Sequence, residues 1–172
     1  MMDLRNSIQK RRSIRTYQSK PIPQEVLEEI IDAARFAPTA RAVEPWEFVI
    51  VRKPERLTEI AHHAVNGKFI AEAAACIAVF CKDTKYYLED GCAAVENMLL
   101  AATSLGVGTC WVAGDKKDYC SDISALLLAP HECKLVALIS CGYPQSPKEF
   151  RSIKRRAVAD ILHWEEFERS TP

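Results

Sequence analysis

Three arginines and one hydroxyl lie within five positions near the start of the sequence. The stretch KRRSIRTY contains Arg11, Arg12, Ser13 and Arg15, although the chain as a whole has 23 basic and 23 acidic residues. Guanidinium groups bind oxyanions through paired hydrogen bonds, and a serine hydroxyl can add another. Cations at the end of a helix over residues 3–12 would also complement the helix dipole, by about 0.3–1 kcal/mol each. From this stretch alone, the helix-dipole interpretation is favoured over an anion site.

A second basic cluster lies near the other end of the chain. The stretch SIKRRA places Lys154, Arg155 and Arg156 in an otherwise irregular C-terminal segment, in which we expect one or two helical turns. Two such clusters in a chain without net charge could converge on one phosphate group, which shifts the balance toward an anion site. A solvated basic tail is the alternative that the sequence leaves open.

Two further stretches have the character of ligand platforms. The loop at residues 37–45, within FAPTARAVEPWEFVIV, has a proline near each end that would keep it stiff before a hydrophobic strand. The stretch LGVGTCWVAGD combines an apolar strand with Gly106, Gly108 and Gly114, and glycine lets a backbone approach a ligand closely. Neither GxGxxG nor GxxxxGK[ST] occurs in the chain, so a Rossmann site and a P-loop are disfavoured.

Alternating helices and strands must position these stretches. Apolar periodicity and β-branched runs predict helices at residues 3–12, 22–37, 54–65, 91–106 and 121–129, and strands at residues 45–53, 75–82, 107–114 and 134–144. This order predicts a layered α/β architecture in one domain of residues 1–172, with a turn at Gly142 after the last strand. The apolar run at 75–82 lacks alternation, which indicates burial on both faces.

The helix expected at residues 91–106 carries a single charge, Glu96, with apolar or small residues on every face. A helix that is apolar all round is normally enclosed by protein. Because one small core cannot easily enclose a whole helix, we expect this helix to form part of a subunit interface.

Composition argues against several classes of function. Balanced charge and a pI near 6.9 give no support for nucleic acid or an anionic membrane as a partner. No apolar run approaches the ~18 residues of a spanning helix, and the N-terminus lacks a signal-peptide core, so we expect a cytoplasmic protein without membrane contact. Seven cysteines without CxxC, and four histidines without ligand spacing, favour buried reduced thiols over disulfides or a metal site.

Taken in order, these stretches resemble the FMN-dependent nitroreductase family of short, single-domain oxidoreductases. RRSIRTY, APTARAVEPWEFVIV, AAVENMLLAATSLGVGTCW, CGYP and a basic tail follow one another over nearly the whole chain. The resemblance implies an α+β fold of three layers, α/β/α, with a central mixed, mostly antiparallel sheet flanked by helices. It also implies an intertwined homodimer with two FMN sites at the subunit interface, in which the C-terminal segment crosses to the partner.

The resemblance further implies roles for individual residues. Those matched to the FMN phosphate and the pyrimidine edge of the flavin are Arg11, Arg12, Ser13, Arg15 and Arg155, together with Lys154 and Arg156. A second group matches the cofactor-binding loop: Pro38, Thr39, Ala40, Ala42 and Glu44. A third group matches the segment that lies along the isoalloxazine and offers backbone N–H groups near N5: Trp111, Val112, Ala113 and Gly114. Asn66 and Lys68 fall near a region that can contact the ring.

The loop departs from the family pattern APS-x-x-N-x-Q-PW. Thr39 replaces the usual Ser and keeps a hydroxyl, whereas Ala42 replaces Asn and removes an amide whose hydrogen bond would contribute ~1 kcal/mol. Glu44 replaces Gln, and an ionised carboxylate ~4 Å from reduced flavin would oppose its negative charge by ~4 kcal/mol before compensation. These changes bear on the redox potential more than on FMN binding.

The activity implied is hydride transfer from NAD(P)H, through flavin N5, to a small electron-poor acceptor such as a nitroaromatic or a quinone. Water can protonate such products, so we assign no catalytic acid or base and no metal. Two alternatives stay open: a flavin-binding or redox-sensing module with little turnover, and a specialised relative such as a reductive dehalogenase. The dehalogenase would need a substrate lid, and the segment at 83–90, with Tyr86 and Tyr87, is short.

Overall fold

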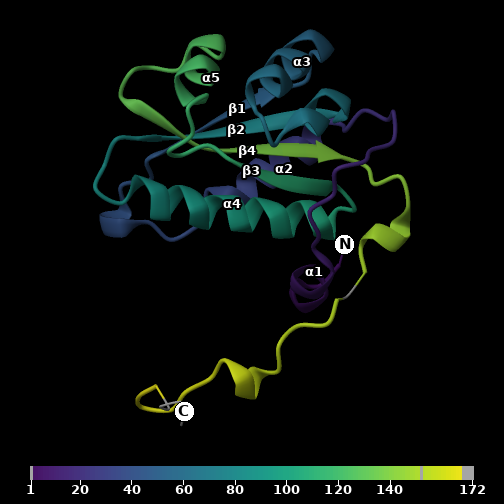
Figure 1. Ribbon diagram of the computed structural model, residues 1–172, viewed down its shortest axis with the longest axis vertical. Coiled ribbons are helices and arrows are strands. Elements are labelled where there is room, and N and C mark those ends of the chain that lie inside the picture. Colours follow the sequence, from purple (N-terminus) through teal and green to yellow (C-terminus); the bar gives the residue numbers. More distant parts are fainter. Residues whose placement is uncertain (1, 152, 168–172) are drawn as a thin grey trace.

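A four-stranded sheet between two helical layers forms the body of the protein. The computed structural model describes residues 2–151 and 153–167 (Figure 1). The strands are β1 (Trp46–Val51), β2 (Ala75–Lys82), β3 (Gly108–Ala113) and β4 (Cys133–Gly142), and their order in the sheet is β1-β2-β4-β3. All three pairings are antiparallel, and an isolated parallel bridge joins Ser13 to Thr109. The predicted mostly antiparallel sheet is confirmed.

Helices cover both faces of the sheet. They are α1 (Leu4–Lys10), α2 (Gln24–Ala34), α3 (Pro54–His63), α4 (Tyr87–Ser104) and α5 (Cys120–Leu126). Short 3₁₀ helices in the connections are η1 (Ala40–Ala42), η2 (Lys68–Glu72), η3 (Pro147–Glu149) and η4 (Val158–Asp160). Figure 1 shows α2 and α4 on one face and α3 and α5 on the other, which confirms the predicted three layers.

Two hydrophobic clusters, one on each face, hold the layers together. Ile77 and Val79 of β2 belong to the cluster under α2 and α4, whereas Ala78 and Phe80 belong to the cluster under α3 and α5. Successive residues of a strand point to opposite faces, so a strand covered on both sides needs apolar residues throughout. This arrangement confirms the prediction for residues 75–82 and explains the missing alternation.

Helix α4 is longer than predicted and only partly enclosed. It begins at Tyr87 rather than at residue 91, so the end of the supposed lid segment at 83–90 forms its first turn. Gly91 masked this extension, and glycine is required there because a Cβ would lie 2.8 Å from the Val136 side chain. Ala94 and Met98 are buried against the sheet, but Glu96 is exposed on the opposite side. Within one chain, therefore, only one face of α4 is enclosed by protein, whereas the prediction was enclosure on every face.

Helix α1 is tied to the end of α4. Asp3 caps α1 by accepting a hydrogen bond from the Asn6 N–H at 2.9 Å, and the Met2 N–H donates to the Ser104 carbonyl oxygen at 3.2 Å. Leu4 is 67% exposed and Ile8 is 55% exposed, so the apolar stripe predicted for this helix is largely uncovered in one chain.

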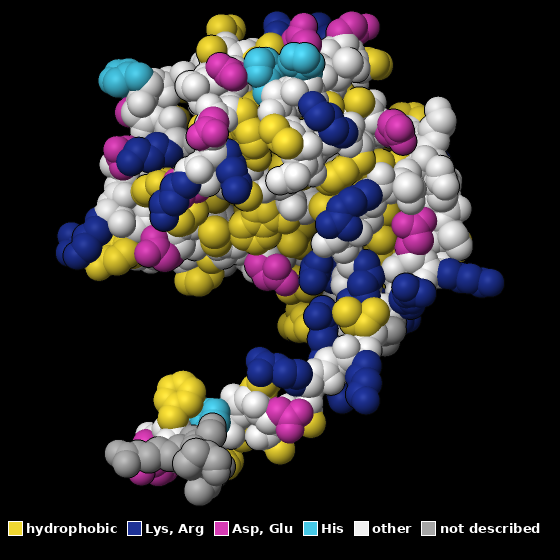
Figure 2. Space-filling view, in the orientation of Figure 1, with side chains coloured by type: hydrophobic (Ala, Val, Ile, Leu, Met, Phe, Trp, Pro, Cys, Tyr) yellow, Lys and Arg dark blue, Asp and Glu magenta, His cyan; other side chains and the backbone are white. Residues whose placement is uncertain are grey.

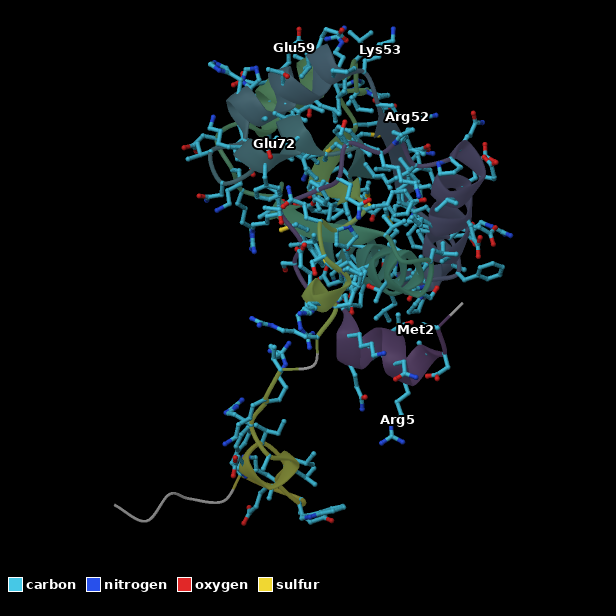
Figure 3. The ribbon with its side chains drawn as sticks, turned by 90° about the vertical axis from the view of Figure 1, so that its right-hand side faces the viewer. Met2, Arg5, Arg52, Lys53, Glu59 and Glu72 are labelled. Atoms are coloured by element: carbon cyan, nitrogen blue, oxygen red, sulfur yellow. The ribbon has the colours of Figure 1, made fainter. Side chains whose placement is uncertain are left out.

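The C-terminal tail, defined as residues 151 and 153–167 of the described chain, leaves the body without packing on it. All of these residues are exposed. Figure 3 shows the tail leaving the body close to α1, whose Arg5 side chain points away from the body. The predicted helical turns reduce to η4 among the described residues. Among residues 2–151 and 153–167, no helix has the length and apolar character needed to cross a membrane.

Candidate functional site

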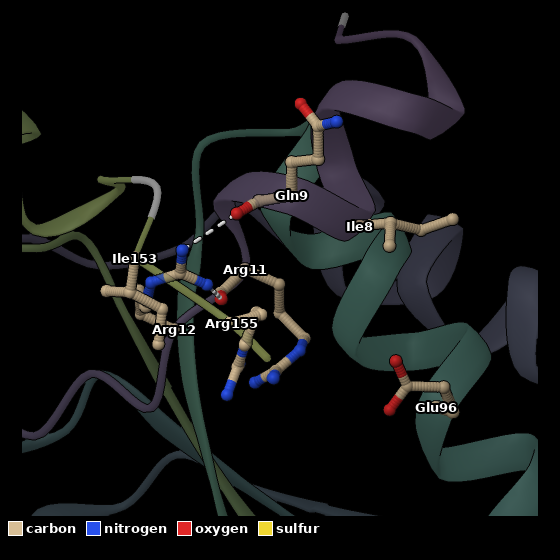
Figure 4. Close-up of a pocket in the computed structure, with 7 residues that line it drawn as sticks. All are labelled: Ile8, Gln9, Arg11, Arg12, Glu96, Ile153 and Arg155. Carbon is tan, nitrogen blue, oxygen red and sulfur yellow. Dashed lines mark hydrogen bonds between the residues drawn. The ribbon is translucent and has the colours of Figure 1, made fainter. Parts of the chain in front are cut away.

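Arginines from both ends of the chain meet at one pocket. Arg11 and Arg12, at the end of α1, and Arg155, from the tail, line a pocket of about 600 Å³ together with Glu96 of α4 (Figure 4). Figure 2 shows Lys and Arg side chains gathered where the tail leaves the body. The convergence of the two basic clusters, which the sequence alone could not establish, is therefore present within a single chain.

The pocket holds three guanidinium groups and one carboxylate, that of Glu96. Within residues 2–151 and 153–167, the ion pairs involve none of Arg11, Arg12 and Arg155. Burial lowers the pKa of the Arg12 guanidinium below its usual value, and the nearby charge of Arg155 adds to that effect. A bound anion would relieve this repulsion, so the electrostatics suit a phosphate group.

Arg12 also acts as the cap of α1, as the helix-dipole interpretation required. Its guanidinium donates hydrogen bonds to the carbonyl oxygens of Arg11 and of Gln9, the latter at 2.8 Å. These carbonyls lie at the C-terminal end of the helix, where cations are stabilising. Its Nε is buried and has no hydrogen-bond partner among the described residues. The two interpretations of the arginine stretch are thus compatible, because Arg12 caps the helix while Arg11 faces the pocket.

Ser13 faces a neighbouring pocket of about 440 Å³. That pocket shares Arg12 with the first one and is also lined by Lys148 and Arg151. Lys148 and Arg151 were not among the predicted site residues, although both lie within four residues of the start of SIKRRA. By contrast, Lys154 and Arg156 line neither pocket and are exposed, so the structure separates Arg155 from its two basic neighbours.

Arg15 points toward a different element. Its guanidinium lies 5.7 Å from the centre of the Phe69 ring of η2 and donates a hydrogen bond to the Ser13 carbonyl oxygen at 3.3 Å. This placement brings η2 next to the arginine stretch. Lys68, however, donates to the His62 carbonyl oxygen at 2.8 Å, so its ammonium group is held against α3.

The free edge of β3 runs beside the arginine stretch. The Ile14 N–H donates to the Thr109 carbonyl oxygen at 2.9 Å, so the backbone of Thr109 faces away from β4. Because strand backbones alternate, Trp111 and Ala113 face the same free side. Tyr119 donates a hydrogen bond to the Ala113 carbonyl oxygen on that side. The backbone N–H groups of Trp111 and Ala113 therefore point away from β4, along the sheet edge that Ser13 and Ile14 border.

Only part of the predicted segment at 111–114 can offer N–H groups there. The Gly114 N–H donates to the Val136 carbonyl oxygen at 3.0 Å, and a Cβ at Gly114 would lie 2.8 Å from the Val136 carbonyl carbon. Gly114 therefore serves close packing within the sheet. The N–H of Val112 alternates with those of its neighbours and faces β4, which leaves Trp111 and Ala113 as the candidates.

The loop at residues 37–45, to which Pro38 belongs, is strained and anchored. Arg41, Ala42 and Glu44 all have left-handed backbone angles, with φ values of 61°, 52° and 49°. Each such residue costs ~1 kcal/mol or more, and strain of this kind accumulates at functional sites. The Ala40 N–H donates to the Asp90 carboxylate at 3.0 Å, and the Glu44 N–H donates to the Thr39 hydroxyl at 3.4 Å.

One chain does not bring this loop to the arginines. Ala40 is hydrogen-bonded to the first turn of α4, whereas Met2, just before α1, is hydrogen-bonded to Ser104, the last residue of α4. Fourteen residues of helix separate Asp90 from Ser104, roughly 21 Å at 1.5 Å per residue. The loop therefore contacts the first turn of α4, whereas the arginine pocket reaches Glu96 near the middle of the helix, and no residue of the loop lines that pocket.

Thiols and metal ligands add no further site. All seven cysteines are free, and Cys76, Cys81 and Cys141 are fully buried in the sheet, as predicted for residues in apolar runs. Burial raises the pKa of the Cys141 thiol to about 12, so it stays protonated and unreactive at neutral pH. Within the described residues, no group of three or more His, Cys, Asp or Glu side chains could hold a metal ion.

The chain matches a known protein family over most of its length. The sequence profile of the Nitroreductase family matches residues 8–89 and 82–143. These ranges include the arginine stretch, the loop at 37–45, α4 and the edge of β3. They end before the tail that carries Arg155.

Individual relatives agree with this match. An Archaeoglobus fulgidus protein, provisionally named NADH dehydrogenase/NAD(P)H nitroreductase, is 34% identical over 91% of this chain and 94% of its own. Iodotyrosine deiodinase 1 of Rattus norvegicus is 28% identical over 90% of this chain and 67% of its own. A provisionally named nitroreductase of Desulfovibrio desulfuricans, solved in complex with FMN, superposes with a TM-score of 0.79 at 28% identity over 98% of this chain and 99% of its own.

Proposed function

Because this chain belongs to the nitroreductase family, we propose that it is an FMN-dependent NAD(P)H oxidoreductase. The observation that carries the proposal is the convergence of Arg11, Arg12 and Arg155 on one pocket without a directly paired carboxylate. A phosphomonoester such as that of FMN supplies the dianion that this charge cluster lacks.

The residues of this chain fit the parts of FMN in a consistent order. The three arginines would hold the phosphate, with the Ser13 hydroxyl as a further donor beside them. The backbone N–H groups of the β3 edge, at Trp111 and Ala113, would donate to the ring. FMN, when bound, supplies a group that accepts a hydride from NAD(P)H and passes it to an electron-poor acceptor. The protein's part is to orient the reactants and to stabilise negative charge on the ring.

A homodimer would complete this site. No residue of the loop at 37–45 lines the pocket that holds the arginines of its own chain, so in this proposal the loop meets those of a second copy. The half-covered face of α4 and the exposed apolar side chains of α1 are suitable contact surfaces. The tail also exposes Val158, Ile161, Leu162, Trp164 and Phe167, which have no core of their own.

The proposed acceptors are small electron-poor molecules, including nitroaromatics and quinones. Protonation of such products needs only water, so the proposal includes no catalytic acid or base from a side chain. The seven free thiols are those expected of a protein from a reducing compartment, which supports the cytoplasm as its proposed location.

Reductive dehalogenation is a second candidate, favoured by the similarity to iodotyrosine deiodinase. Against it, residues 87–90 form the first turn of α4 and leave only Asp83–Tyr86 as a free connection after β2. That connection is too short to cover a substrate by itself. Iodotyrosine offered as the acceptor to the reduced protein distinguishes the two candidates, because only the dehalogenase would release iodide.

The proposed function is tested by the visible spectrum of the purified protein, followed by anaerobic titration with NADH and NADPH. We expect a flavin spectrum that either nicotinamide bleaches and that a quinone restores. A preparation that stays colourless in excess FMN would overturn the proposal. A flavin spectrum that neither nicotinamide bleaches would favour the alternative of a flavin-binding module without turnover, which Ala42 and Glu44 suggested.

A further inference from the structure

Two facing glycines form a slot in the sheet for the segment that carries the arginines. Gly108 of β3 pairs with Gly142 of β4, which ends that strand rather than forming the predicted turn. A Cβ at Gly108 would lie 2.9 Å from the Cβ of Ile14, and one at Gly142 would lie 2.5 Å from Cδ1 of Tyr17. Both positions therefore need glycine for the approach of the protein's own N-terminal segment, rather than of a ligand.

A buried pair of hydroxyls fixes that segment in the slot. The Tyr17 hydroxyl lies 2.6 Å from the Ile14 carbonyl oxygen and 2.6 Å from the Ser140 hydroxyl. Tyr17 is 6% exposed and Ser140 is fully buried. A carbonyl can only accept, so Tyr17 donates its single proton to Ile14 and Ser140 donates to Tyr17. Loss of either hydroxyl would break this chain of buried hydrogen bonds, in which the Ser140 hydroxyl also lies 3.4 Å from the Cys110 carbonyl oxygen.

The same contacts set the distance between the arginines and the edge of β3. Backbone hydrogen bonds join Ile14 to Thr109 at 2.9 Å and Gln18 to Tyr143 at 2.8 Å, on either side of the tyrosine contacts. Arg15 therefore lies between anchored residues, and Trp111 is two residues from Thr109 along β3. The segment cannot shift along the strands without breaking the Tyr17–Ser140 contact.

We propose that Tyr17 and Ser140 are positioning residues for the cofactor. They hold the phosphate-binding segment in register with the ring-binding edge of β3, although neither side chain takes part in the site itself. This inference rests on the proposed FMN function. Its specific consequence concerns the phosphate, because β3 remains paired with β4 when the N-terminal segment loosens. Tyr17 and Ser140 should therefore determine how strongly the protein prefers FMN to riboflavin, which lacks the phosphate.

The test is to titrate the full chain, freed of flavin, with FMN and with riboflavin and to compare the two dissociation constants. Tyr17→Phe and Ser140→Ala each remove one hydroxyl with little change of shape. Thr103→Val is a matched control, because it removes a buried hydroxyl that donates to the Leu99 carbonyl oxygen at 2.8 Å within α4. We expect the preference for FMN to fall about tenfold in the first two variants and to stay within twofold in the control, although all three lower Tm.

The outcomes separate this inference from the function on which it rests. If the unmodified protein binds neither flavin, the proposed function fails and the inference fails with it. If it prefers FMN and Tyr17→Phe keeps that preference while losing only thermal stability, the inference alone is overturned. Should Tyr17→Phe not fold, Ser140→Ala decides the matter in the same way, because it keeps the hydrogen bond from Tyr17 to the Ile14 carbonyl oxygen.

Discussion

The two basic segments of this chain are held in different ways. The N-terminal segment is anchored through Ile14 and Tyr17, which are 3% and 6% exposed, so the sheet determines its shape without a ligand. The C-terminal tail also brings an arginine to the pocket, but all its described residues are exposed. Both segments thus supply positive charge, but the N-terminal segment is ordered by its own chain, whereas the tail needs a further surface to pack on. The comparison indicates that half of the proposed phosphate site is formed in advance.

Among the changes considered for the two segments, deletion of residues 157–172 should have the largest effect on dimer association and FMN binding. If a second copy holds the tail, the deletion removes large apolar side chains whose burial contributes about 1.5–3 kcal/mol each. The dimer dissociation constant should then rise about a hundredfold or more, with loss of bound FMN. Sedimentation velocity measures the association, and circular dichroism should show an intact body. A deletion variant that dimerises as tightly as the full chain would mean that the tail is not held by a second copy.

Substitutions within the tail test whether FMN binding depends on the position of Arg155 or only on the overall charge of the tail. Arg155→Gln should raise the FMN dissociation constant about tenfold or more, because a hydrogen bond to a charged group contributes ~1.5–3 kcal/mol. Arg156→Gln is the matched control and should change it less than twofold, since Arg156 lies outside both pockets. Equal losses in a flavin titration would show that only the overall charge of the tail attracts the cofactor.

The strained loop at 37–45 offers a smaller test on the half of the site assigned to the partner. Ala42 has a φ of 52°, a conformation that glycine adopts freely and asparagine adopts more readily than alanine. Ala42→Gly should raise the free energy of unfolding by about 1 kcal/mol without tightening FMN binding. Ala42→Asn should also bind FMN more tightly, by about fivefold, because it restores an amide. Equal FMN affinities in the two variants would exclude a role for that amide.

The buried thiol of Cys81 should have the smallest effect near neutral pH, and that effect is on the free energy of unfolding. Burial, with the charge of Asp90 next in importance, raises the pKa of this thiol to about 12. In the unfolded chain the thiol ionises near pH 8.5, so rising pH favours unfolding from there up to about pH 12. Urea unfolding at pH 7 to 11 should show this decline, and Cys81→Ala should make it shallower. The deletion variant should behave as the full chain does, since the tail does not cover Cys81.

Local sequence patterns predicted the fold where neighbours along the chain decide the structure. The apolar run of β2 and the stripe of α2 report their own burial, because strand and helix periodicities follow directly from backbone geometry. The start of α4 was missed because Gly91 resembles a helix boundary and is instead a packing requirement against Val136. Likewise, Gly108 was interpreted as leaving room for a ligand, whereas it leaves room for Ile14.

The candidate site depends on relations that the sequence does not carry. Arg11 and Arg155 are separated by more than a hundred residues, and only the folded chain shows that both reach one pocket. The prolines around residues 37–45 indicated a stiff loop, but no local pattern predicts a left-handed backbone at Glu44, since such angles are rare outside glycine. The distance of this loop from the arginines is likewise a tertiary property.

The exposed position of Arg155 on an unpacked tail has a consequence for how the protein should be handled. If a second copy holds that tail, retention of the yellow colour becomes a matter of mass action between subunits. Dilution below the dimer dissociation constant would release flavin into solution, and specific activity would fall as the assay is made more dilute. Added FMN at high concentration would restore it.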